Sequence, residues 1–391
     1  MSKRFRLFGR RADEGGVAVT VGILLASGVL LGMTALAVDV GQLYAEREEL
    51  QSGADGVATA VSLACARQTI DCADNGALAT KYGNGNALDN RTDVTEICGS
   101  APGVSSTNLL PDCVPGLYPD NLTDCIGEIP ANSRGWVQVH TSTERDTASD
   151  RYILPYSFAQ SLTGSKGATV GACARVAWGT PLSGVAVTFC TAEFNASTGD
   201  GTDLAPAPPA IPDDSYEKTL IIQSGNGNSG GNNGGGNNGG YNGNCSHGPS
   251  GWDLPGDFGF TDAQDGTCMT LLSQLYYPKP GNAADNTQIC RDFFASARAN
   301  RTPIGIPIFS LASGTGNNGQ YQLDGIAAFV ITGYDLTNIG RAESTLTQAE
   351  CPQNEKCLMG YFTRAITSLE DWNGEFGSVP SFGASIIKTV G

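Results

Sequence analysis

The strongest pattern in the chain is an uninterrupted apolar run near its N-terminus. Residues 17–38 carry no charged side chain and are mostly apolar. Folded as an α-helix, they would extend about 33 Å, which matches the roughly 30 Å hydrocarbon core of a bilayer. We therefore expect a transmembrane helix over 17–38, preceded by a short tail formed by residues 1–16.

The charges that flank this run predict its orientation. Five basic side chains lie within the first 11 residues, whereas the chain as a whole has a net charge of −16. The positive-inside rule then makes 1–16 a cytoplasmic basic tail and puts the bulk of the chain outside the cytoplasm. A cleaved signal peptide is the competing interpretation, because Ala35-Leu36-Ala37 fits a signal-peptidase site. We favour an uncleaved anchor, because the apolar run is longer than a signal-peptide core and the helical pattern continues past that site.

The helical pattern beyond the apolar run has a period of seven residues. Its members are Leu36, Leu43, Leu50, Val57 and Ala64, with Val40, Ala54 and Val61 four places after three of them. This spacing predicts one helix from about residue 17 to residue 64, with a juxtamembrane part over 39–65. The apolar stripe formed by Leu43, Leu50, Val57 and Val61 could pack on the protein's own domain or dock on partner helices, and the pattern leaves both open.

Residues 15–65 also resemble a known family. The apolar span is followed by a Val-Asp-x-Gly-x-Leu-Tyr string, then a Leu-Gln-x-x-Ala-Asp string and an alanine-rich helix. In this combination they are similar to the N-terminal segment of TadE/TadG-type Flp pilus-assembly proteins of the bacterial tight-adherence (Tad) system. The family motif comprises Val38, Asp39, Gly41, Leu43, Tyr44, Leu50, Gln51, Ala54 and Asp55. The resemblance implies that the membrane and other Tad pilus-assembly proteins are partners.

After residue 65 the sequence predicts an α+β region over 66–180. Residues 135–143 alternate between two faces, with Val137, Val139 and Thr141 on one and Gln138 and His140 on the other. Residues 168–178 repeat this pattern less strictly, so we expect the two segments to pair as strands. A short helix is expected between them, over 155–162.

The remaining residues, 181–391, predict a cysteine-containing, β-rich domain. Strands are expected over 183–190, 218–223, 304–311 and 323–336, and a helix over 267–276. Residues 225–244 are almost entirely Gly and Asn, so we expect a disordered loop there. This half resembles the C-terminal parts of TadG-related proteins of actinobacteria, on the basis of Trp252, a Pro-Ile-Phe strand and a Gly-Tyr-Phe-Thr segment.

All 12 cysteines follow the apolar run, as expected for disulfides in an oxidising compartment. We expect Cys351 and Cys357 to pair, because a five-residue spacer closes easily. The other pairings stay open. Zinc is the rival interpretation, but the chain has no Cys-x-x-Cys pair and only two histidines, so we expect no metal and no cofactor.

The sequence offers little catalytic chemistry. His140 and His247 are the only histidines, and the closest approach to a nucleophile elbow, around Ser250, has Trp252 in place of its second glycine. We therefore expect no catalytic residues and no enzyme; an envelope hydrolase is the least favoured hypothesis. The acidic charge disfavours nucleic-acid binding.

Together these patterns predict an α+β protein with a long N-terminal transmembrane helix that extends outward into disulfide-containing, β-rich extracytoplasmic domains. The favoured function is a membrane-anchored structural component of a Tad/Flp-type pilus assembly or secretion system that acts by protein–protein contacts. The alternative is a cell-surface adhesin or ligand-binding protein with a disulfide-stapled ectodomain, which would have a surface ligand as its partner.

Overall fold

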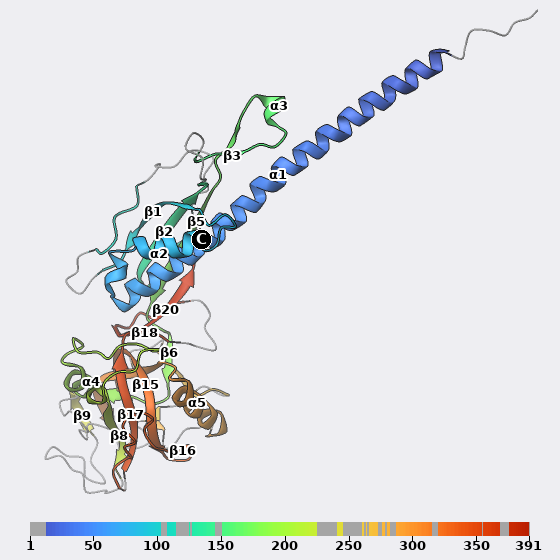
Figure 1. Ribbon diagram of the computed structural model, residues 1–391. Helices are drawn as coiled ribbons and strands as arrows, with labels where there is room; N and C mark the ends of the chain where they lie inside the picture. The colour runs from blue at the N-terminus through green and yellow to red at the C-terminus, as the bar shows by residue number, and fades with distance from the viewer. Residues whose placement is uncertain are drawn as a thin grey trace, which may run out of the picture.

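The computed structural model shows a long helix followed by two β-sheet lobes (Figure 1). The residues it describes are 13–102, 108–114, 125, 127–144, 151–224, 241–244, 260–261, 263, 266–272, 276–277, 280–281, 287–314, 320–353, 355–367 and 375–390.

The N-terminal element is one continuous helix, α1, over Asp13–Arg67. Its 55 residues correspond to a length of about 82 Å. The helix ends where Gln68 takes a left-handed conformation, with φ of 55°. The single helix expected from about residue 17 to residue 64 is confirmed. Among the described helices, α1 is the one long and apolar enough to cross a membrane, and its most apolar stretch is not buried in the protein.

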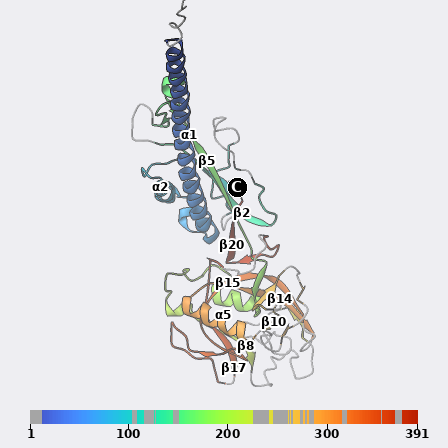
Figure 2. The same cartoon turned by 90° about the vertical axis from the view of Figure 1, so that its right-hand side faces the viewer.

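The second half of α1 lies against the first lobe, a five-stranded sheet (Figures 1 and 2). The strand order is β1 (Asp93–Ser100), β2 (Ser133–Ser142), β5 (Gly171–Gly179), β20 (Ala384–Thr389) and β18 (Ala365–Ile366). The predicted pairing of 135–143 with 168–178 is confirmed, since β2 and β5 pair antiparallel with Val139 opposite Ala174. The alternation along β2 is confirmed as well: Val137 and Val139 are completely buried in the core shared with α1.

Short elements complete the first lobe. After α1 the chain forms the one-turn helix η1 (Ile70–Cys72) and then α2 (Gly76–Asn84), which packs on α1. Between β2 and β5 a hairpin of β3 (Leu154–Pro155) and β4 (Gly167–Ala168) carries the one-turn helix α3 (Gln160–Thr163). The short helix expected over 155–162 is therefore displaced toward the C-terminus, because Pro155 is part of strand β3.

The second lobe is built on a nine-stranded sheet. Its main strand order is β7 (Phe189–Cys190), β14 (Ile304–Gly314), β15 (Gln320–Leu336), β17 (Glu355–Thr363) and β8 (Lys218–Ser224), with β9 (Tyr241–Asn244), β12 (Tyr276–Tyr277), β16 (Gly340–Ala342) and β19 (Ser381–Phe382) attached. The expected strands over 218–223, 304–311 and 323–336 are confirmed. Among its described residues this lobe also contains the helices α4 (Thr191–Thr198), η2 (Asp214–Tyr216) and α5 (Thr287–Asn300). Two further strand pairs are β6 (Ser183–Val185) with β11 (Met269–Leu271), and β10 (Phe260–Thr261) with β13 (Pro280–Gly281).

Several expectations for this half need correction. The helix expected over 267–276 is wrong, because β11 and β12 occupy its described ends and pair with β6 and β15. The single strand expected over 183–190 is split into β6 and β7. Of the disordered Gly/Asn loop expected over 225–244, residues 225–240 lie outside the described residues. The last four residues form β9, which pairs with β14, so the expectation is wrong for them.

The C-terminal strand returns to the first lobe. β20 pairs with β5, with Ile387 opposite Trp178, and thus lies in the sheet that packs on α1. The division expected from the sequence, into 66–180 and 181–391, assigns β20 to the second part of the chain, whereas the strand belongs to the first sheet. The first sheet is completed by β20, which begins at Ala384, whereas β5 ends at Gly179.

Candidate functional site on the long helix

The family-motif residues fall on two different parts of α1. Asp39 lies just after the exposed apolar stretch, where the β3–β4 hairpin reaches the helix. Leu50, Gln51, Ala54 and Asp55 lie further on, against β2 and β5.

Asp39 holds the hairpin to the helix. Its carboxylate accepts hydrogen bonds from the backbone N–H groups of Ser157 (2.7 Å to Oδ1), Phe158 (3.1 Å to Oδ2) and Ala159 (2.5 Å to Oδ2). These N–H groups belong to the three consecutive residues just before α3, and Asp39 is the acceptor for all three. The Ser157 hydroxyl also donates to Gln42 Oε1 (3.2 Å).

Asp39 is only 2 % exposed, so its charge depends on these donors. Burial raises the pKa of the Asp39 carboxyl, but the backbone hydrogen bonds outweigh it and hold the pKa below its ordinary value. The ionised carboxylate is therefore the form that the hairpin binds.

The apolar stripe of α1 packs on the protein's own sheet. Leu50 is 1 % exposed, and Val57 and Val61 are completely buried. Val57 and Val61 share a core with Val137 and Val139 of β2. Of the two roles left open by the sequence, the structure assigns these three residues to internal packing. A partner helix cannot reach them in the folded protein.

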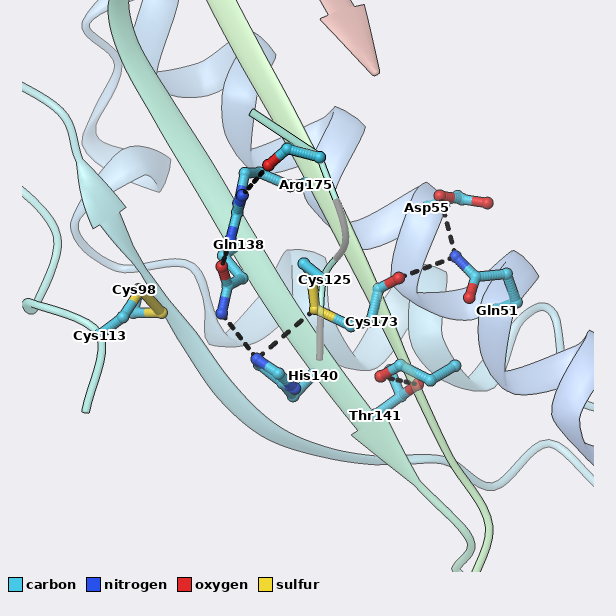
Figure 3. Close-up of a disulfide and its surroundings, with 12 residues drawn as sticks. Gln51, Asp55, Cys98, Cys113, Cys125, Gln138, His140, Thr141, Cys173 and Arg175 are labelled. Carbon is cyan, nitrogen blue, oxygen red and sulfur yellow. Dashed lines mark hydrogen bonds between the residues drawn. A yellow bond between two sulfur atoms is a disulfide. The ribbon is translucent and has the colours of Figure 1, made fainter. Parts of the chain in front are cut away.

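Polar groups fix the register of α1 on the sheet (Figure 3). Thr141 Oγ1 donates to the backbone carbonyl of Leu50 (3.0 Å), and Gln51 Nε2 donates to the carbonyl of Cys173 (3.0 Å). Gln51 also reaches Asp55 Oδ1 (3.4 Å). Burial raises the pKa of the Asp55 carboxyl above its usual range, and the hydrogen bond from Gln51 only partly offsets this.

Other motif positions face away from the domain. Tyr44 is 64 % exposed and Val38 is 40 % exposed. A methyl group added at Gly41 would meet no atom within 4 Å. Leu43 and Tyr44 line an open groove of about 380 Å³ between α1 and the segment 168–171 at the start of β5. This face of the helix is therefore available for contact with another molecule.

The described disulfides lie within each of the two lobes. The described disulfides are Cys65–Cys72, Cys98–Cys113, Cys125–Cys173, Cys268–Cys290 and Cys351–Cys357. Cys351 and Cys357 have Cα atoms 5.8 Å apart and close the turn before β17. Cys65–Cys72 ties the end of α1 to η1.

Among the described residues, one group could offer three metal ligands: Cys125, His140 and Cys173, whose ligand atoms lie within 4.8 Å of one another. Their chemistry does not fit a metal, because the two sulfurs are bonded to each other and provide no thiolate. Arg175 Nε donates to Gln138 Oε1 (3.0 Å), which turns the Gln138 amide nitrogen toward His140 Nε2 (2.7 Å; Figure 3). That histidine nitrogen is thus already occupied as an acceptor.

No catalytic constellation forms around His140, the one histidine among the described residues. His140 is buried with Gln138 and the Cys125–Cys173 disulfide. His247 and the Ser250 segment lie outside the described residues.

The comparisons with known proteins point to the same helix. Neither the curated proteins nor the solved structures gave a match to the chain. Residues 15–68, which comprise α1 from its third residue onward and the following Gln68, match the family described as putative Flp pilus-assembly TadE/G-like. The N-terminal segment of this chain therefore matches a TadE/G-like Flp pilus-assembly domain.

Proposed function

We propose that the protein is a membrane-anchored structural component of a Tad/Flp-type pilus assembly or secretion system, with its N-terminal tail in the cytoplasm and both lobes outside. One observation carries this proposal. The segment that matches the family is a single helix whose apolar first half is left uncovered and whose second half is built into the core of the first lobe.

The way α1 is divided supports a role in assembly. An exposed apolar helix is costly in water and stable in a bilayer, so the first half favours membrane anchoring. The second half shares a core with the sheet, so the lobe follows the anchor as one body. Such a protein would act by positioning its lobes and by contacts, without chemistry of its own.

The proposed contact surface is the face of α1 that the lobe leaves open, around Tyr44 and the groove beside it. Leu50, Val57 and Val61 are excluded because they are buried in the protein's own core. The occupant we propose is a helix of another membrane component of the Tad system, because it would leave the bilayer beside α1 at the level of this groove.

A photocrosslinking experiment in cells tests the proposal. A photoreactive phenylalanine analogue replaces Tyr44 in the full chain, and a matched variant carries it at Ile211, which is 69 % exposed and lies on the second lobe. We expect Tyr44 to crosslink to a membrane protein of the Tad system, and Ile211 not to. The proposal would be refuted if this crosslink were absent and if cells without the Tad ATPase displayed the protein on their surface as usual. That result would favour the adhesin.

A further inference from the structure

The β3–β4 hairpin is separated from both sheets and lies beside the middle of α1. Figures 1 and 2 show the hairpin and α3 running along the helix toward its N-terminal half. The hairpin is short: Leu154 pairs with Ala168 and Pro155 with Gly167. An element so small contributes little core of its own, so its position depends on what holds it to α1.

Asp39 provides that hold, one residue after the expected membrane span ends. A carboxylate at the edge of a bilayer is costly unless its charge is satisfied by hydrogen bonds. Here three consecutive backbone N–H groups of the hairpin satisfy it. The hairpin therefore shields the Asp39 carboxylate, and the carboxylate in turn fixes the position of the hairpin along α1.

Before Asp39 the helix is open on its surface. Leu31 and Met33 are exposed by 70 % and 67 %, and a methyl group added at Gly32 would meet no atom within 4 Å. The hydrogen bonds between the hairpin and α1 are made at Asp39 and Gln42. The hairpin therefore meets the helix at the boundary where the expected membrane span ends, and it leaves the span itself free for lipid.

The side chains of the hairpin suit that boundary. Phe158, just before α3, is 50 % exposed, and Tyr152, two residues before the hairpin, is 47 % exposed. Gln160, Ser161 and Thr163 of α3 are exposed too, so polar side chains lie close to Phe158 in the chain. Aromatic residues gather at membrane–water interfaces, where the ring meets the acyl chains and polar neighbours meet the headgroups.

We propose that the hairpin over 154–168 rests on the membrane surface from which α1 emerges, with Phe158 in contact with lipid and Asp39 as the residue that positions it. The proposal depends on the membrane anchoring stated under the proposed function. It gives the first lobe two points of contact with the bilayer, and two points prevent rotation of the lobe about the axis of α1.

Photocrosslinking in vesicles tests this placement. The full-length protein is reconstituted in vesicles of phosphatidylethanolamine and phosphatidylglycerol, with p-benzoylphenylalanine in place of Phe158, Leu31 or Ile211. Lipid adducts are then measured by mass spectrometry. We expect adducts at Phe158 and Leu31 and none at Ile211, although Ile211 is more exposed than Phe158.

The substitution Asp39→Asn tests the positioning role. An amide presents one acceptor where the carboxylate presents two charged ones, so the ratio of docked to undocked hairpin should fall about tenfold or more. Lipid adducts at Phe158 should fall with it, while adducts at Leu31 stay constant. A near-UV circular dichroism spectrum identical to that of the unsubstituted protein would show that the lobes remain folded. If the variant does not fold, the comparison of lipid adducts at Phe158 and Ile211 still tests the placement of the hairpin.

The outcomes separate this inference from the proposed function. Adducts at Leu31 without adducts at Phe158 would overturn the inference and leave the anchor intact. Crosslinking of Phe158 to a second copy of the chain would also overturn it, because the hairpin would then be a protein interface. Absence of lipid adducts at both Phe158 and Leu31 would refute the membrane anchor itself.

Discussion

Truncating Leu50 to alanine separates internal packing of the α1 stripe from partner docking. Leu50 is 1 % exposed, and its backbone carbonyl accepts a hydrogen bond from Thr141, so its side chain lies at the junction of α1 and β2. Removing three carbons from such a site and leaving a cavity costs about 2–5 kcal/mol. For a lobe of this size, each kcal/mol corresponds to a shift in Tm of about 2–4 °C.

We therefore expect Leu50→Ala to lower the Tm of the purified full-length protein by about 6–12 °C for a cost near 3 kcal/mol, with no partner present. The Tm is measured by near-UV circular dichroism in detergent. Leu88→Ala is the matched control, since Leu88 is 89 % exposed and the same truncation there should shift the Tm by less than about 2 °C. A Leu50→Ala protein with an unchanged Tm that fails to assemble in cells would refute internal packing and restore the partner-docking role.

Two further predictions concern charge and cross-linking. Because the folded pKa of Asp55 is raised, folding favours its protonated form, and the stability this provides is present below the unfolded pKa and lost as the pH rises through the folded pKa. Asp55→Asn should therefore raise Tm relative to the unsubstituted protein more at pH 7 than at pH near 3.5, and an equal difference at both values would contradict the burial of this charge. Replacing both Cys351 and Cys357 by alanine should cost about 2 kcal/mol, measured as a lower denaturation midpoint; an unchanged midpoint in oxidised samples would show that this short loop does not stabilise the second lobe.

Local sequence patterns predicted the elements in which one face packs against a single neighbouring element. The seven-residue period predicted α1, because one face of that helix is buried along its second half. The alternation in 135–143 predicted β2, because Val137 and Val139 face α1 while Gln138 faces the other side. In α1 the period of burial equals the period of the helix, whereas in β2 both faces are buried and only the apolar and polar character of the side chains alternates.

Elements with ambiguous patterns were not predicted. Residues 267–276 are apolar at many positions and suit a strand as well as a helix, and pairing of Met269 with Val185 determines the outcome. Helix α5 did carry a usable signal, since Cys290, Phe294 and Ala297 are buried at helical spacing. The helix expected from the sequence in this region covers the apolar segment 267–276 instead.

The candidate site shows a different limit. The family resemblance singled out Asp39, but its partners are the backbone N–H groups of residues 157–159, almost 120 positions away. Every residue except proline has a backbone N–H group, so no sequence motif could predict which of them bind Asp39. The same holds for the return of β20 to the first sheet, which depends on the path of the whole second lobe.

That return has a consequence for the order of folding. Until residues 384–389 have been synthesised, β5 has no partner on the side that β20 will occupy, and an unpaired strand edge invites pairing with another chain. The second lobe lies between β5 and β20 in the sequence, so this pairing joins residues far apart in the chain and forms slowly. The first lobe is thus begun first and finished last, and until β20 is made the nascent protein must be protected from aggregation at that edge.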